Sequence, residues 1–82
     1  MARVVLTSTL ANRFAGGVHE FQVEVSNVRQ LIRDLETRFP GLGLEIERAA
    51  ALAIDGEIYQ DPFMECLAPE TEVFVLPKIG GG

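Results

Sequence analysis

The sequence has few of the residues that build disulfide-linked, metal-bound or nucleic-acid-binding proteins. It contains no tryptophan, one cysteine and one histidine, and its seven basic residues are outnumbered by 12 acidic ones, a net charge of -5. The single cysteine, Cys66, cannot form an internal disulfide, which indicates a reducing compartment. The acidic balance argues against nucleic-acid binding, which needs a stripe of Lys and Arg. It permits a protein partner with a basic surface.

Membrane and metal signals are also missing. The N-terminal stretch "MARVVLTSTL" lacks the apolar region and cleavage site of a signal peptide. No run approaches the roughly 20 apolar residues that a membrane span needs, so we expect a soluble, cytoplasmic protein. His19 has no second ligand at metal-binding spacing and is expected to be a structural or surface histidine. We expect Cys66 to be a half-buried, inert thiol.

What is present is the composition of one small globular domain. The 82 residues are 48% hydrophobic, enough for a single core but not for two. We expect a folded domain over residues 1–77 and a flexible tail over residues 78–82. The motifs "GLG" and "GG" lack the setting of nucleotide-binding loops, so the chain is not expected to bind ATP alone. Asp55 and Glu57 resemble a carboxylate pair, but a turn accounts for Asp55 and exposure for Glu57.

The first third of the chain predicts a β-hairpin. Residues 3–9 are rich in β-branched side chains, and residues 11–17 are expected to be a loop that ends in Gly16-Gly17. Residues 19–25 then alternate, with His19, Phe21, Val23 and Val25 on one face and polar residues on the other. This period of two is typical of a half-buried strand.

The next segment changes to the period of an α-helix. One apolar stripe follows the spacing i, i+3, i+4, i+7, i+11 and consists of Val28, Leu31, Ile32, Leu35 and Phe39. Asn27 and Gln30 resemble a capping box at its start. Pro40-Gly41 is expected to end the helix, because proline cannot continue the hydrogen-bond ladder.

The second half predicts three more strands. Residues 42–50 are compatible with either a helical turn or extended chain, and Asp55-Gly56 predicts a type I′ hairpin turn. Residues 61–70 form a turn-rich connection held by Phe63 and Leu67. The strand "TEVFVLP" is expected to be buried on both faces and to lie in the middle of the sheet, parallel to the first strand. The predicted order β-β-α-β-β-β, with the helix across one face, is an α+β, ubiquitin-like β-grasp fold with a mixed sheet of four to five strands.

The last strand runs almost directly into Gly80, Gly81 and Gly82. Chain ends often fray, but an alternative is that the tail enters another protein's active site. Residues 77–82, fully extended, would span roughly 20 Å. Glycine passes where side chains would clash, and the fixed φ of Pro77 can direct the tail. The α-carboxylate of Gly82 would then be the reacting group.

Four stretches resemble the MoaD/ThiS family of sulfur-carrier proteins. They are "RVVLTSTLANRFAGG", "NVRQLIRDLETRFPG", "LAIDGE" and "EVFVLPKIGGG", which together span essentially the whole chain. The combination of the DGE hairpin, the proline-containing last strand and the terminal Gly-Gly carries the specificity. Gly80 departs from the family, whose members commonly have a different residue before the final pair. The segment between the helix and the hairpin is also short, which leaves the subfamily open.

The resemblance implies that the protein is a carrier and not an enzyme. A partner of the ubiquitin-activating type would use ATP to adenylate Gly82, with Gly81 threading its channel. A sulfur donor would convert the adenylate to a thiocarboxylate, and a synthase would accept the sulfur. Molybdopterin synthesis is weakly favoured, with cysteine or thiazole synthesis as alternatives. A protein modifier linked through Gly82 and a plain interaction module remain open, although the single lysine, Lys78, disfavours self-conjugated chains.

The partner is expected to bind the last strand and the tail. If Val73 and Val75 face the helix, Phe74 and Leu76 face the opposite side of the sheet, where grouped apolar residues often mark a partner site. A covering loop or packing on neighbouring strands is the alternative. Pro77, Lys78, Ile79 and Gly80 complete the predicted partner-binding segment, with Lys78 available to an acidic partner.

Overall fold

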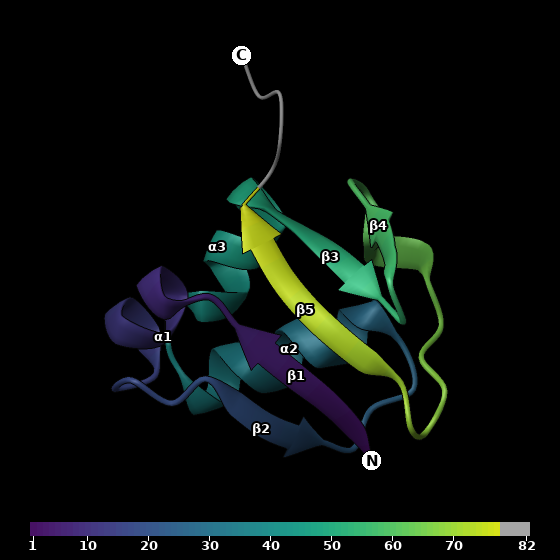
Figure 1. The fold of residues 1–82 in the computed structure, drawn as a ribbon, viewed down its shortest axis with the longest axis horizontal. Helices are drawn as coiled ribbons and strands as arrows, with labels where there is room; N and C mark the ends of the chain where they lie inside the picture. The colour runs from purple at the N-terminus through teal and green to yellow at the C-terminus, as the bar shows by residue number, and fades with distance from the viewer. Residues whose placement is uncertain (78–82) are drawn as a thin grey trace.

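The structure, a computed structural model, describes residues 1–77 and shows the predicted β-grasp fold (Figure 1). The helices are α1 (Ser8–Phe14), α2 (Val28–Arg38), α3 (Leu42–Ala49) and a short 3-10 turn, η1 (Pro62–Met64). The strands are β1 (Ala2–Leu6), β2 (Glu20–Val23), β3 (Ala50–Ile54), β4 (Glu57–Tyr59) and β5 (Glu72–Pro77). They form one mixed sheet of five strands in the order β2-β1-β5-β3-β4.

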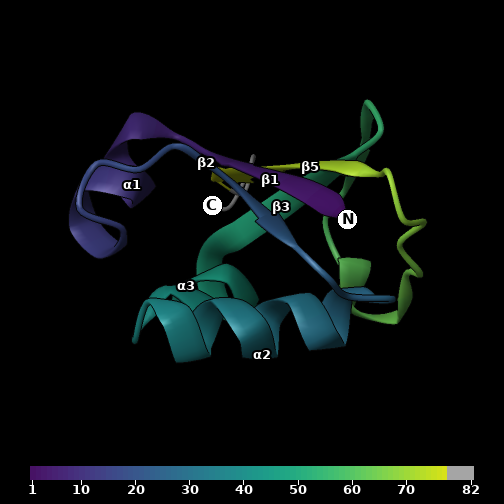
Figure 2. The same ribbon diagram turned by 90° about the horizontal axis from the view of Figure 1, so that it is seen from below.

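The last strand lies in the centre of the sheet, as predicted. β5 pairs with β1 in parallel and with β3 antiparallel. Helices α2 and α3 cover one face of the sheet (Figure 2). Val73 and Val75 of β5 are fully buried on that face, together with Leu31 and Leu35 of α2. The prediction that β5 is buried on both faces was wrong, because Phe74 and Leu76 are only partly buried; within residues 1–77, no helix packs on their side.

The predicted helix is confirmed as α2. The Asn27 side chain accepts a hydrogen bond from the Gln30 backbone N–H at 2.8 Å. The Gln30 side chain in turn accepts from the N–H of Ser26, also at 2.8 Å, so the capping pair closes one residue earlier than in a standard capping box. The helix ends before Pro40, and Gly41 takes a positive φ of 100° that suits glycine.

The N-terminal connection differs from the predicted loop. β1 ends at Leu6, and α1 occupies most of the segment between the two strands. Thr7 caps this helix by accepting a hydrogen bond from the Leu10 N–H at 3.3 Å, and Leu10, Ala11 and Ala15 are buried in the core. Residues 7–9 are therefore not strand. The predicted antiparallel pairing of β1 with β2 is confirmed.

The ambiguous segment after Gly41 is helical and becomes α3. Helices α2 and α3 approach closely at Gly43, where an added Cβ would lie 2.7 Å from the Ile32 carbonyl oxygen and 2.8 Å from the Glu36 Cβ. The Glu36 carboxylate accepts the backbone N–H groups of Gly41 at 2.8 Å and Leu44 at 3.1 Å. It therefore satisfies donors at the start of α3 that the helix itself leaves unpaired.

The hairpin turn has the predicted geometry. Asp55 and Gly56 have positive φ angles of 48° and 87°, as a type I′ turn requires. The Asp55 side chain also accepts a hydrogen bond from the Glu72 N–H at 3.0 Å, and its own N–H donates to the Glu72 carbonyl at 2.9 Å. The turn is thereby fastened to the beginning of β5. In the following connection Leu67 is buried and Phe63 packs against the core, as predicted.

The remaining local expectations have mixed outcomes. His19 is exposed and precedes β2, so it does not share the inward face with Val23. Cys66 is exposed and not half-buried. Within residues 1–77, no three His, Cys, Asp or Glu side chains are grouped to hold a metal ion. No helix in that part of the chain is both long and apolar enough to cross a bilayer.

Candidate functional site

The point where residues 78–82 join the fold is defined by Pro77. Because β5 and β1 are parallel, their carboxyl ends lie at the same edge of the sheet. Helix α1 begins just after β1, and α3 passes directly into β3, whose first residue, Ala50, pairs with Pro77. The attachment point is therefore bordered by the beginnings of α1 and β3. The predicted site residues Lys78, Ile79, Gly80, Gly81 and Gly82 lie outside the described residues.

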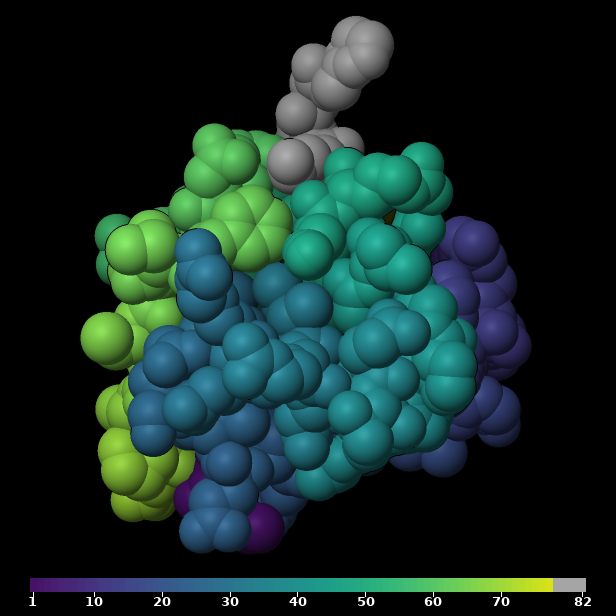
Figure 3. Space-filling view, turned by 180° about the vertical axis from the view of Figure 1, so that it is seen from behind, coloured from purple at the N-terminus to yellow at the C-terminus, as the bar shows by residue number. Residues whose placement is uncertain are grey.

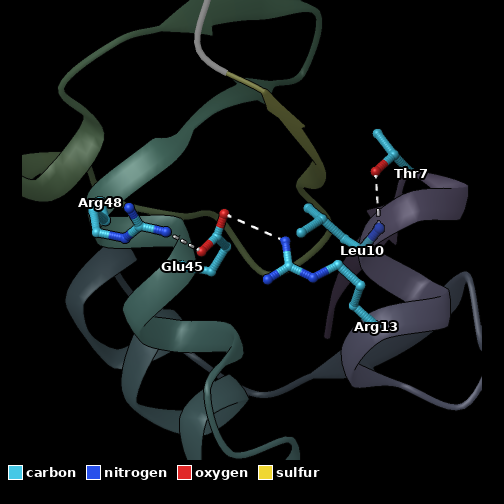
Figure 4. Close-up of polar contacts among 5 residues, drawn as sticks. All are labelled: Thr7, Leu10, Arg13, Glu45 and Arg48. Carbon is cyan, nitrogen blue, oxygen red and sulfur yellow. Dashed lines mark hydrogen bonds and ion pairs between the residues drawn. The ribbon is translucent and has the colours of Figure 1, made fainter.

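Charged side chains link the two helices near this edge (Figure 4). Glu45 of α3 pairs with Arg48 of the same helix at 2.8 Å and with Arg13 of α1 at 3.8 Å. The Glu45 side chain is only 17% exposed, whereas that of Arg48 is 74% exposed. One carboxylate thus serves two guanidinium groups, and the exposed side of the cluster carries an excess of positive charge. The sequence pattern did not indicate this cluster, because Arg13 is 32 residues from Glu45 and on a separate helix.

The face of the sheet opposite α2 and α3, called here the open face, carries the predicted residues Phe74 and Leu76. Their orientation follows from strand alternation, because Val73 and Val75 point into the core. The register sets Val5 of β1 and Ala53 of β3 beside Phe74, and Ala51 of β3 beside Leu76. One strand further, Ile58 of β4 lies next to Ala53. The open face therefore has an apolar strip that crosses four strands.

The strip combines partly shielded and exposed apolar groups. Ile58 is 54% exposed and Val5, Phe74 and Leu76 are intermediate, whereas the small side chains of Ala51 and Ala53 on β3 are buried. On one side it is bordered by Arg3, which pairs with Glu20 at 3.2 Å and Glu72 at 3.1 Å. Sequence reasoning identified Phe74 and Leu76 but missed Val5, Ala51, Ala53 and Ile58. Strand alternation on β1, β3 and β4 could have indicated which side chains share a face. Only the strand register, however, shows which of them lie beside Phe74 and Leu76.

Two shifted pKa values have structural causes outside this strip. The N–H groups of Gly41 and Leu44 hold the pKa of the Glu36 carboxyl below its ordinary value of 4.5. Glu57 next to Tyr59, with desolvation and Glu65 as further causes, raises the pKa of the Tyr59 hydroxyl above 10.0. A capping hydrogen bond and neighbouring like charge explain both shifts without an acid–base role.

No family model matches the sequence, and neither does any curated protein. Solved structures do match. Mycobacterium tuberculosis CysO, described as an antigen, aligns with a TM-score of 0.82 at 17% identity, over 96% of this chain and 100% of its own. A chain of the Amycolatopsis orientalis BexX/CysO complex aligns with a TM-score of 0.82 at 18% identity, over 100% of both chains. At this identity the likeness establishes a shared fold.

Proposed function

We propose that this protein is a sulfur carrier that is activated at the carboxylate of Gly82 by an adenylating partner enzyme. The observation that carries the proposal is the direct continuation of the central strand of a β-grasp domain into the sequence "KIGGG". A rigid central strand fixes where the tail begins, and three glycines let the backbone enter a channel that side chains would block. The resemblance of the chain to MoaD/ThiS proteins supports this function.

The chemistry takes place on the chain end, and the partner supplies the catalysis. A Gly82 carboxylate oxygen attacks the α-phosphorus of ATP, the bond to the β-phosphate breaks, and pyrophosphate leaves. The terminal sulfur of a persulfide then attacks the acyl carbon, and AMP leaves. A second thiol cleaves the resulting acyl disulfide, which frees the thiocarboxylate and oxidises the two thiols to a disulfide. The carrier would contribute the carboxylate of Gly82, which carries no Cβ, and no catalytic side chain.

The open face provides the docking surface in this proposal. Phe74 and Leu76 lie on β5, the strand from which the tail departs, and Ile58 extends the apolar strip two strands away on β4. Contact with the open face would position the partner and direct the tail toward the partner's active site at the same time. The exposed Arg48 near the tail attachment would favour acidic groups on the rim of the partner's channel. The existence of a complex between CysO and BexX in Amycolatopsis orientalis supports a protein partner for this fold.

The sulfur acceptor stays open in the proposal. The molybdopterin branch, which the sequence weakly favours, gains no support from the two structural neighbours, both of which involve CysO. Molybdopterin, cysteine and thiazole synthesis are therefore all retained as destinations. A protein modifier uses the same adenylate and differs only in the final acceptor, a lysine amine in place of sulfur.

The test is the intact mass of the protein after incubation with ATP, a sulfide or persulfide source, and a soluble extract of its own organism. We expect a gain equal to the difference between a sulfur and an oxygen atom, and its complete loss when Gly81 and Gly82 are both deleted, because deletion of Gly82 alone would leave a chain that still ends in Gly-Gly. The matched control is Gly80→Ala, which changes the tail but keeps the terminal pair and should retain the product. A thiocarboxylate-reactive probe would confirm the group.

Other outcomes would contradict the carrier function. Conjugates on lysines of other proteins, without the sulfur product, would establish a modifier. A protein with neither product, in an extract that activates a known carrier, would leave an interaction module whose glycines are incidental. In that case deletion of Gly81 and Gly82 should not affect partner capture by the open face.

A further inference from the structure

A second surface lies on the helix-covered side, away from the open face. An open hollow of about 750 Å³ lies between α2, α3 and η1, on the face that Figure 3 shows. Its apolar part is made by Ile32 of α2, Leu44 of α3 and Phe63 of η1. Leu44 is 67% exposed although it is a large aliphatic residue. We call this hollow, with the charged residues that border it, the helix groove.

Two arginines on the α2 wall of the groove form no ion pair within the described residues. The chain has six arginines, and Arg3, Arg13, Arg38 and Arg48 each pair with a carboxylate. Arg29 and Arg33, one helical turn apart on α2, form no ion pair with any of residues 1–77 and both line the groove. Glu36 also lines the groove and keeps its negative charge, but its two oxygens accept N–H groups at the start of α3 and it forms no ion pair with either arginine. Two guanidinium groups are thus available beside an apolar hollow.

From this arrangement we infer that the helix groove binds an acidic amphipathic helix of a partner protein. An apolar side chain of that helix would contact Leu44, Ile32 and Phe63, and carboxylates along one flank would pair with Arg29 and Arg33. From Arg29 to Thr37 the groove follows α2 for roughly 12 Å, the length of about two helical turns. Glu47 on the opposite wall favours a neutral or basic flank on that side and sets the orientation.

The net charge of -5 does not prevent this binding. Charges separated by more than about 8 Å are largely screened at physiological salt, whereas a carboxylate in contact with a guanidinium is screened much less. Local complementarity therefore decides the choice of ligand. Because the groove and the open face lie on opposite sides of the sheet, both can be occupied at once. The inference does not depend on the chemistry of the tail.

The experiment uses the full-length, ¹⁵N-labelled protein and a synthetic three-turn helical peptide, acetylated and amidated, with leucines on one face and glutamates along one flank. We expect its titration to shift the backbone amide signals of α2 and α3. A twin peptide with lysine in place of glutamate should bind more weakly. Arg29→Ala/Arg33→Ala should weaken binding of the glutamate peptide roughly threefold to tenfold. The matched double variant Arg3→Ala/Arg13→Ala removes the same charge elsewhere and should leave the affinity within about twofold.

Leu44→Ala separates binding from folding. The side chain is mostly exposed, so its truncation should weaken the peptide complex while the thermal midpoint stays nearly constant. The inference would be overturned by any of three results: equal affinities for the two peptides, equal weakening by the two double variants, or no binding at millimolar peptide. Shifts confined to the open face would relocate the site, and shifts that depend on protein concentration alone would identify a second copy as the occupant; both would also overturn it.

Discussion

The two faces of β5 use neighbouring residues for different purposes. Val73 and Val75 are fully buried against the helices, whereas Phe74 and Leu76, between and beyond them, are only partly buried on the open face. The same strand therefore stabilises the fold with one set of alternate side chains and leaves the other set partly exposed, where we propose that a partner docks. Because the sets alternate along the chain, stability and docking can be altered separately by substitutions one residue apart.

The largest expected loss of stability comes from substitutions on the closed face, the face of the sheet that α2 and α3 cover. Val75→Ala removes two methyl groups from a fully buried position and should lower the free energy of unfolding by about 2–3 kcal/mol. In a domain of this size that corresponds to a fall in thermal midpoint of roughly 10–20 °C. Urea denaturation of Val75→Ala and Leu76→Ala side by side is the measurement. Equal losses would mean that the two faces of β5 do not differ as described.

Gly43→Ala tests how tightly the helical layer of that closed face is packed. The added methyl group would lie 2.7 Å from the Ile32 carbonyl oxygen, so α2 and α3 would have to separate. We expect a loss of about 1–3 kcal/mol, in spite of the better helix propensity of alanine.

The control for Gly43→Ala is Glu47→Ala on the exposed side of the same helix, which should change stability by no more than about 0.5 kcal/mol. Thermal unfolding followed by circular dichroism compares the two variants. A stability of Gly43→Ala at or above that of the parent protein would show that the helices can separate at no cost.

Leu76→Ala tests the open face. The side chain is only partly buried, so we expect a stability loss of about 1 kcal/mol or less. Affinity for the proposed adenylating enzyme, measured by calorimetry, should fall about tenfold or more if Leu76 is at the centre of the contact. Met64→Ala, an exposed residue on η1, should leave that affinity unchanged. Unaltered affinity with a large loss of stability would assign Leu76 to the fold alone.

The smallest expected effect is a pH-dependent one at Glu36. Its pKa in the folded protein is lowered from 4.5 by the N–H groups of Gly41 and Leu44. A lowered folded pKa means that the stabilisation is fully present above the ordinary carboxyl pKa and is lost as the pH falls through the folded value. Glu36→Gln should therefore be less stable than the parent at neutral pH and should approach it in acid.

Denaturation curves at a series of pH values measure this difference. Glu24→Gln, an exposed carboxyl in the loop after β2, is the control and should show a smaller dependence. A constant difference between Glu36→Gln and the parent across the pH range would contradict the capping role of the carboxylate.

Most of the architecture could be predicted from local patterns. The helical stripe of α2, the Asp55-Gly56 turn and the strongly β-prone final strand were each identified correctly. Connectivity rules then placed β5 in the centre of the sheet. The failures were short elements: α1 has seven residues, below the length at which a helix is stable alone, and its Gly16-Gly17 end resembled a hairpin loop. It forms because Leu10, Ala11 and Ala15 are buried in the core.

The sequence by itself determined the central strand, the main helix and the glycine-rich end, because each is encoded by residues close together in the chain. Tertiary structure alone decided the state of residues 42–49, whose alternating Leu42, Leu44 and Ile46 suit a strand as well as a helix. The close approach at Gly43 and the Glu36 cap select the helix. Tertiary structure also decided which residues make up the open face and the helix groove. Both surfaces bring together residues from three or more elements, and that proximity exists only once strand register and helix packing are fixed.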